Sequence, residues 1–215
     1  MSDDRSFGSR VTDQWFRTAP SDPTAWYAQA PVLRGPDVTL REATRGDAFA
    51  LFAIVSDPRV AACVVPGPKS PADLAELIDA AAFDRRSRRG IWLSIVLSNS
   101  RLAGLIRLRE IEPGFGSADC EIVLAPEQWG SGLFVRSAST AIDLAFDTLG
   151  ANRLEARIAA SNVRAQAAFR KLGAAQEAVL RQSIQLARGS YDDQILVTLF
   201  ADDWRERREI IQHIH

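Results

Sequence analysis

Apolar and polar residues alternate along several stretches of the chain. This pattern predicts strands, because successive side chains of a strand point to opposite faces of a sheet. The alternation is clear at 102–111, where Arg107 and Arg109 separate apolar residues. A polar turn at 98–101 joins this stretch to an apolar run at 91–97, which is typical of a hairpin. Further strands are expected at 38–41, 120–124, 153–159, 178–186 and 194–200.

Apolar residues three or four positions apart predict helices between these strands. Thr44 and Asp47 have capping-box spacing before the first helix, and Ser70 followed by Pro71 is a typical start of the second. Helices are expected around 49–53 and at 70–81, 132–149 and 162–173. The order is strand, two helices, three strands, helix, strand, helix, two strands. The later strand–helix–strand units can supply parallel crossovers.

The composition limits the class of protein. The 215 residues are 47% apolar and 25% charged, which is ordinary for a globular protein with a core. A net charge of -1 argues against a broad nucleic-acid surface. No run approaches the roughly 18 apolar residues of a membrane helix, and the polar start does not resemble a secretory signal. Cys63 and Cys120 are the only cysteines, which excludes a disulfide framework or a four-thiolate zinc site within one chain. We therefore expect a cytoplasmic protein.

Three segments allow two interpretations each. The first 30 residues form either a loosely ordered extension or an arm that docks on the body or on a second subunit. Their aromatic residues are Phe7, Trp15, Phe16, Trp26 and Tyr27. The basic run 84–89 is expected to be a solvated turn, with contact to an acidic substrate or RNA as the alternative. The end of the chain, 202–215, is expected to be a charged helix or a frayed end.

A glycine-containing loop joins a predicted strand to the long third helix. Residues 126–134 read Pro-Glu-Gln-Trp-Gly-Ser-Gly-Leu-Phe. Glycines allow close approach to a ligand, and the N–H groups of the helix start favour an anion such as phosphate. A plain tight turn is the alternative. A dinucleotide fingerprint would need glycine at Val135, and the Gly-Lys-Ser/Thr of a Walker loop is absent.

A second segment, 162–174, lies one strand–helix unit downstream and contains Asn162 and a Lys-Leu-Gly run. With the loop and the strand order, it resembles the GNAT acyl-CoA N-acyltransferases, in particular the RimJ/RimL-type ribosomal-protein N-acetyltransferases. The late hairpin at 189–193 and Asp203-Trp204 fit the same branch.

The resemblance implies an α+β fold. Its single mixed sheet has seven mostly antiparallel strands, flanked by about four helices, and its central parallel strands splay apart. The similarity covers 31–204 as an N-acetyltransferase domain, with 1–30 as an extension and 205–215 as a tail.

The resemblance also implies acetyl-CoA as co-substrate and no metal. The strand near Leu124 would pair with the pantetheine arm, and Asn162 would hydrogen-bond it, with a plain helix cap as the alternative role of Asn162. Phe134 stands where the family has a small residue. The expected cofactor-binding residues are Leu124, Trp129, Gly130, Ser131, Gly132, Leu133, Phe134, Val135 and Asn162.

The implied reaction transfers an acetyl group to a primary amine, which must lose a proton before it attacks. Asp119 and Glu121 are the candidate bases, because they share one face of the strand that leads into the loop. The alternative is a pair of solvated carboxylates. Cys120, on the opposite face, is expected to be a buried hydrophobe.

The general acid is less well defined. Phe169 and Ala165 stand where relatives often carry Tyr and Ser, and Phe169 is expected to be core. Tyr191, and also Ser139, could replace the missing acid.

Two functions remain open at this point. The first is an acetyltransferase that acts on a protein N-terminus or a small-molecule amine, whose specificity lies in loops such as 56–70 and 111–118. The second is a catalytically silent module that binds acyl-CoA or other proteins. We expect no membrane partner and no nucleic acid. A homodimer is left open, and His213 and His215, at a flexible end, are a poor basis for a metal site.

Overall fold

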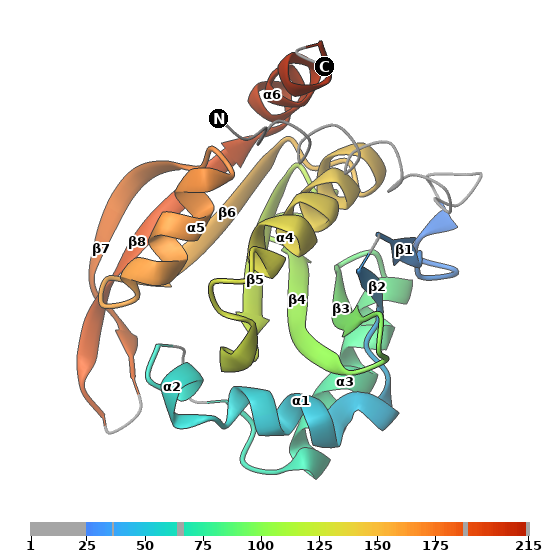
Figure 1. Ribbon diagram of the computed structural model, residues 1–215, viewed down its shortest axis with the longest axis vertical. Coiled ribbons are helices and arrows are strands. Elements are labelled where there is room, and N and C mark those ends of the chain that lie inside the picture. Colours follow the sequence, from blue (N-terminus) through green and yellow to red (C-terminus); the bar gives the residue numbers. More distant parts are fainter. Residues whose placement is uncertain (1–24, 36, 64–66, 187–188, 214–215) are drawn as a thin grey trace, which may run out of the picture.

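The computed structural model describes residues 25–35, 37–63, 67–186 and 189–213. Within these residues, eight strands form one sheet in the order β1-β2-β3-β4-β5-β6-β8-β7 (Figure 1). The strands are β1 Leu33–Arg34, β2 Val38–Glu42, β3 Gly90–Leu97, β4 Leu102–Glu110, β5 Ser117–Leu124, β6 Arg153–Ala159, β7 Ala175–Gln185 and β8 Tyr191–Phe200. Neighbours in the sheet are antiparallel except β5 and β6, which run parallel. The predicted mixed, mostly antiparallel sheet is confirmed, and the strand added to the expected seven is the two-residue β1.

The helices are α1 Ala48–Val55, α2 Pro58–Ala61, α3 Pro71–Arg86, α4 Leu133–Asp143, α5 Val163–Lys171 and α6 Ala201–His213. Helix α4 continues into a π-helical turn at Leu144–Thr148. Helices α4 and α5 cover one face of the sheet, and α1 and α3 pack on the other. No helix in the described ranges is both long and apolar enough to cross a bilayer.

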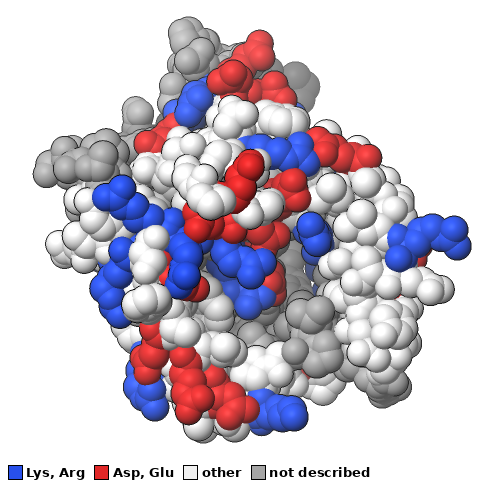
Figure 2. Space-filling view, turned by 180° about the vertical axis from the view of Figure 1, so that it is seen from behind, with Lys and Arg blue, Asp and Glu red and all other residues white. Residues whose placement is uncertain are grey.

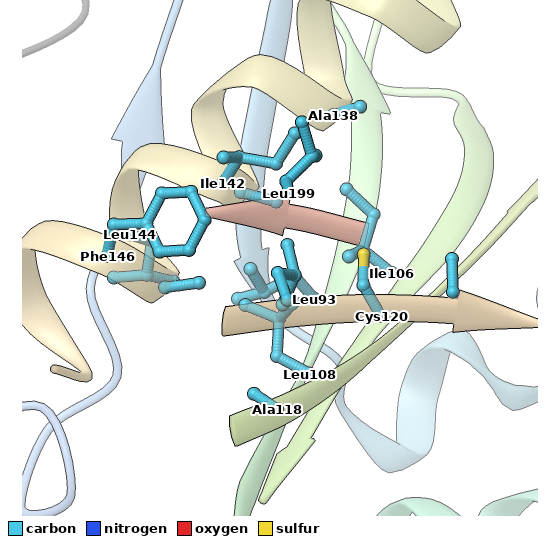
Figure 3. Packing of buried hydrophobic residues seen from close by; sticks show 14 of the residues in the cluster. Leu93, Ile106, Leu108, Ala118, Cys120, Ala138, Ile142, Leu144, Phe146 and Leu199 are labelled. Atoms are coloured by element: carbon cyan, nitrogen blue, oxygen red, sulfur yellow. The ribbon is translucent and has the colours of Figure 1, made fainter. Parts of the chain in front are cut away.

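The main core lies between α4 and the centre of the sheet. Figure 3 shows Ala138 and Ile142 of α4 above Ile106, Leu93 and Cys120 of the strands. The pattern follows the alternation in the sequence, since Ile106, Leu108, Ala118 and Cys120 all point to this face and are at most 3% exposed. The side chains that alternate with these, among them Leu105, Arg107 and Asp119, point to the opposite face.

Both predicted helix starts are confirmed. Asp47 closes the capping box by accepting from the Thr44 N–H at 2.8 Å, and it also accepts two hydrogen bonds from Arg41, at 2.7 and 2.8 Å. Burial raises the pKa of Asp47, but the hydrogen bonds from Arg41, Thr44 and Ser94 outweigh it and leave this pKa below its ordinary value. At α3, the Ser70 hydroxyl accepts from an N–H of the first turn.

The described part of the N-terminal segment docks on the body. Trp26 is 5% exposed and meets Phe115 edge to face at 5.6 Å, and the guanidinium of Arg88 lies 3.9 Å from the ring centre of Tyr27. Phe7, Trp15 and Phe16 lie outside the described residues. The docking interpretation is therefore confirmed for Trp26 and Tyr27. The predicted domain boundary between residues 30 and 31 places both residues outside the domain whose core they contact.

The basic run at 84–89 is not simply a solvated turn. Helix α3 continues to Arg86, and Arg85 is buried. Its side chain pairs with Glu42 at 2.7 Å and donates to the carbonyl oxygens of Trp26 and Tyr27. The expectation was wrong for Arg85 because its hydrogen bonds satisfy the buried guanidinium.

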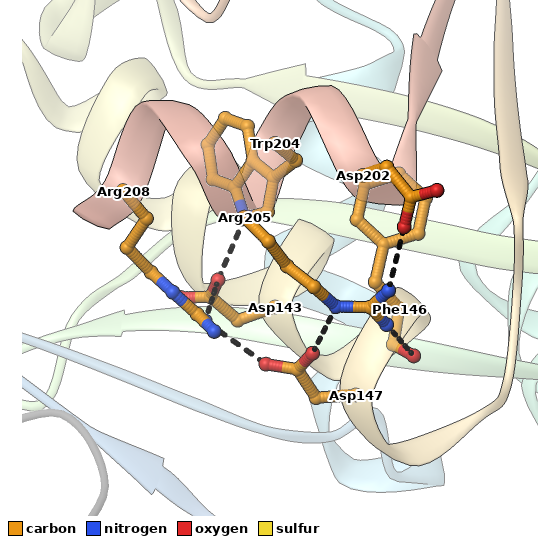
Figure 4. A network of polar contacts seen from close by, with 7 residues as sticks. All are labelled: Asp143, Phe146, Asp147, Asp202, Trp204, Arg205 and Arg208. Carbon is orange, nitrogen blue, oxygen red and sulfur yellow. Dashed lines mark hydrogen bonds and ion pairs between the residues drawn. The ribbon is translucent and has the colours of Figure 1, made fainter. Parts of the chain in front are cut away.

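The C-terminal segment forms α6, and the predicted boundary after Trp204 falls inside this helix. The Trp204 indole donates to Asp143 at 2.8 Å, and Arg208 bridges Asp143 at 2.8 Å and Asp147 at 2.9 Å (Figure 4). Arg205 also pairs with Asp147. These contacts tie α6 to the end of α4, so the segment as far as Arg208 is packed rather than frayed.

Candidate active site

The parallel strands β5 and β6 part from each other in the middle of the sheet. Their pairing ends at Asp119 and Glu155, although β5 continues to Leu124 and β6 continues to Ala159. Strand β5 stays paired with β4 along its other edge. The edge of β5 that faces the split beyond Asp119 therefore presents backbone groups without a strand partner, and such groups can pair with an extended ligand.

A cavity of about 560 Å³ opens at this split. It is bounded by the end of β5, the loop before α4, the first turn of α4, helix α5, and the region of α2. Among the described residues that line it none is acidic, whereas Arg59, Arg164 and Lys171 contribute three positive charges. The cavity therefore favours a polyanionic ligand.

The loop before α4 has the geometry that the glycines predict. Gly130 and Gly132 have φ of 82° and 78°, a region that residues with a Cβ atom rarely adopt. The Ser131 hydroxyl accepts the Leu133 N–H at 3.2 Å. The N–H groups of an α-helix point toward its N-terminal end, and those of the first turn have no acceptor in a preceding turn. The N–H groups that follow Leu133 in α4 therefore face the loop.

Arg136 braces the same loop. Its guanidinium donates to the carbonyl oxygen of Ser131 at 3.2 Å and pairs with Asp37 at 2.9 Å. A Cβ atom at Gly132 would lie 2.9 Å from this guanidinium, so the loop and the Arg136 side chain are in close contact.

Trp129 connects three elements around the cavity. Its indole donates to the carbonyl oxygen of Leu124 at 3.2 Å. The guanidinium of Arg164 lies 4.1 Å from its ring centre, and that of Arg59 lies 6.0 Å from it. Arg59 also pairs with Glu127 at 3.1 Å. The cationic side chains from α2 and α5 thus meet on one aromatic platform.

Asn162 occupies the position that both of its predicted roles require. Its Oδ1 accepts the Ala165 N–H at 3.1 Å, so it caps α5, and the residue also lines the cavity. Among the described residues, its Nδ2 has no hydrogen-bond partner. The cap is confirmed, and contact with a ligand stays a prediction.

Two aromatic rings separate the cavity from the core. Phe169 is 5% exposed and meets Phe134 edge to face at 5.3 Å. Phe169 is therefore core, as expected. Phe134 lines the cavity with its neighbour Val135, and Ala165 lines it from α5.

The two candidate bases lie on the sheet face opposite α4. Glu121 pairs with Arg107. Burial raises the pKa of Asp119, and the positive charges of Arg109, Arg107 and Arg157 oppose this rise without cancelling it. Asp119 forms no ion pair with a described residue, so its carboxylate is the more available of the two. Neither residue is among those that line the cavity, and both stand next to the split.

Cys120 lies between them on the core face, where it is 3% exposed. Burial raises the pKa of its thiol, so the expectation of a buried hydrophobe is confirmed.

Tyr191 begins β8, is 63% exposed, and is not among the described residues that line the cavity. Ser139 is half-buried on α4. The identity of the acid stays a prediction.

Sequence reasoning did not identify Arg59, Arg164 or Lys171 as site residues. Arg164 and Lys171 lie inside the predicted segment 162–174, but their direction depends on how α5 packs. Arg59 reaches the cavity from α2, which is distant in sequence.

Comparison with known proteins assigns the family. Residues 37–175 match the acetyltransferase (GNAT) domain, and the chain belongs to this family. Spermidine N(1)-acetyltransferase of Escherichia coli K12 is 30% identical over 128 residues, which are 60% of this chain and 66% of that protein.

Two solved structures share the fold. The ribosomal-protein-S5-alanine acetyltransferase from Vibrio fischeri is 17% identical, with a TM-score of 0.72 over 80% of this chain and 98% of that one. RimJ of Mycobacterium smegmatis, solved in complex with CoA-disulfide, is 18% identical, with a TM-score of 0.70 over 77% and 83% of the two chains.

Proposed function

We propose that this protein transfers the acetyl group of acetyl-CoA to a primary amine. The observation that carries the proposal is the parting of β5 and β6 beyond Asp119 and Glu155, with a cationic cavity where the strands separate. Family membership supports the reaction class, and solution of a structural neighbour with CoA-disulfide supports the co-substrate.

Different residues of the cavity would bind different parts of acetyl-CoA. Those N–H groups between Gly130 and Val135 that are not already bonded within the loop would bind the pyrophosphate, supported by the positive end of α4. Arg59 and Arg164 add positive charge beside Trp129. The free edge of β5 near Leu124 and the amide of Asn162 would pair with the pantetheine amides.

Asp119 is the proposed base. It accepts a proton from the ammonium form of the acceptor, directly or through one water, and the neutral amine then attacks the thioester carbon. A backbone N–H on the free part of β5 stabilises the oxyanion. The new C–N bond forms as the C–S bond breaks, and the CoA thiolate leaves and takes a proton. Holding the two reactants together in the split supplies a further part of the rate.

The acid that protonates the thiolate is proposed to be Tyr191. The hydroxyl would have to approach the split from the start of β8 once an acceptor is bound. Tyr191→Phe removes only this hydroxyl, so it should lower kcat without changing CoA affinity. An unchanged kcat would show that solvent, and not Tyr191, supplies the proton to the leaving thiolate.

One observation favours a second candidate function, a catalytically silent acyl-CoA-binding module. Phe169 is buried and Ala165 is apolar, so neither can replace the acids found in relatives. Measuring thiol release from acetyl-CoA with a panel of primary amines separates the two functions. Release that depends on an amine supports the transferase, whereas CoA binding by calorimetry without release supports the silent module.

The location and the assembly are also proposals. Use of acetyl-CoA favours the cytoplasm, which fractionation tests. A homodimer would double the mass measured by light scattering.

A further inference from the structure

Charged side chains form a band across the face of the sheet opposite α4. In the sheet register, Arg109 on β4 stands opposite Asp119, and Asp119 stands opposite Glu155 on β6. Two residues further along these strands, Arg107 stands opposite Glu121, and Arg157 follows Glu155 on the same face. Seen from this side, basic and acidic side chains gather near the middle of the face (Figure 2).

Two of the three acidic groups in this band are already neutralised by ion pairs. Glu121 pairs with Arg107, and Glu155 pairs with Arg153 at 2.9 Å. Asp119 is left with two exposed arginines, Arg109 and Arg157, which form no ion pair with any described residue. Both lie close enough to Asp119 to lower its pKa, while burial acts in the opposite direction.

The band therefore offers one carboxylate and two guanidinium groups at the point where β5 and β6 part. An acceptor that brings a single ammonium group to Asp119 would leave both guanidinium groups uncompensated. A diamine or a polyamine would place further positive charge against Arg109 and Arg157, and like charges at close range repel. A guanidinium instead binds a carboxylate or a phosphate through two parallel hydrogen bonds.

We propose that the acceptor of this enzyme carries an anionic group, a carboxylate or a phosphate, beside the amine that is acetylated. The amine lies at Asp119, and the anion lies at Arg109 and Arg157. This inference rests on the proposed acetyltransferase function and narrows its substrate class. It separates this chain from a relative whose name specifies spermidine, a polyamine.

Three acceptors with matched carbon chains test the charge preference. We would measure kcat/KM for thiol release with β-alanine, 1-aminopropane and 1,3-diaminopropane, and add O-phosphoethanolamine as the phosphate form. The value for the better anionic amine should exceed that for the diamine at least tenfold. A smaller ratio, or a preference for the diamine, overturns the inference while the transferase function stands. If no amine at all releases thiol, the transferase function and the inference both fail.

Variants then locate the preference on the two arginines. The double variant Arg109→Gln/Arg157→Gln should reduce the ratio of kcat/KM for the anionic amine to that for the neutral amine at least tenfold. The ratio is the right quantity because a changed pKa of Asp119 affects both acceptors equally. Calorimetry should show unchanged CoA affinity, since neither arginine lines the cavity.

Arg101→Gln is the matched control. Arg101 is also exposed and forms no ion pair with a described residue, but it sits on the turn between β3 and β4. It lies roughly 27 Å from Arg109 along β4, at about 3.4 Å per residue. The ratio of kcat/KM for the anionic amine to that for the neutral amine should be the same in Arg101→Gln as in the unchanged protein. An unaltered ratio in the double variant, or an equal fall in Arg101→Gln, would place the anion elsewhere and overturn the assignment.

Discussion

Asp119 and Glu155 form the last pair between the two parallel strands, and the split that could receive an acyl-CoA arm begins directly beyond them. Their side chains lie on the face opposite α4, together with three arginines that act on Asp119. Glu155 is held by Arg153, and this leaves Asp119 as the carboxylate at the mouth of the split that lacks an ion-pair partner within the described residues.

Asp119→Asn should lower the rate of thiol release by about two to four decades, the usual contribution of a general base. Glu121→Gln should have a smaller effect, because its charge is already paired with Arg107. Calorimetry should find unchanged CoA affinity in both. Asp202→Asn, on the exposed start of α6, is the control. Normal turnover of the double variant at 119 and 121 would leave the base to water or to another group.

The pH profile should report the environment of Asp119. Burial raises its pKa, and Arg109, Arg107 and Arg157 oppose the rise, while the charge of Glu155 adds to it. A base must be deprotonated to act, so kcat/KM should fall on the acidic side at a pH above the ordinary aspartate value of about 3.9. Arg109→Gln removes one charge that lowers the pKa of Asp119, so the acidic fall in kcat/KM should move to higher pH. A shift to lower pH would contradict the assignment.

Gly132→Trp should abolish CoA binding, because a side chain there would occupy the start of α4 and displace Arg136. The backbone has φ of 78°, so the substitution also costs about 1–2 kcal/mol of stability. Gly150→Trp is a matched control with φ of 83° and no atom within 4 Å of its Cβ position. It should share the loss in stability and keep CoA affinity. Equal CoA affinity in the two variants would remove the loop from the binding site.

Asp47→Asn should destabilise the fold by about 1.5–3 kcal/mol at pH 7, the range for hydrogen bonds to a charged group. The folded-state pKa of Asp47 is lowered, so its stabilisation is full above the unfolded pKa and is lost as pH falls through the folded pKa. Urea unfolding at pH 7 and at pH 3 measures this. The difference between the protein and the variant should shrink at pH 3, and a constant difference would show that charge is not its source.

The periodic elements were predictable because burial imposes their pattern. The hairpin of β3 and β4 was placed within one residue at all four of its ends, since the apolar positions of both strands face the core. Strand β1 has only two residues, which is too short to show a period. Arg85 continues the buried stripe of Ile78 and Ala81 at helical spacing. The spacing therefore predicted burial of Arg85, but its charge favoured the interpretation as a solvated turn.

The site was predictable only in part. The glycines and the helix start identified the loop, because its backbone geometry requires these residue types. The stacking of Arg164 and Arg59 on Trp129 depends on tertiary packing of α2 and α5, for which no local pattern exists. The pairing of Glu121 with Arg107 likewise follows from the register of β4 and β5, and it distinguishes two carboxylates that look equivalent in the sequence.

Asn162→Ser tests whether the cap residue of α5 also binds the ligand. Serine is a favoured cap residue, so it should keep the hydrogen bond to the Ala165 N–H and the melting temperature should change little. It lacks the Nδ2 group, which has no partner among the described residues and stands at the cavity wall. CoA binding should weaken by about 1 kcal/mol, roughly fivefold in Kd, the net value of one hydrogen bond. Calorimetry and thermal unfolding of the same samples separate the two roles. A lower melting temperature with unchanged Kd would show that Asn162 is a cap alone. The substitution would then have weakened the start of the helix without affecting the bound ligand.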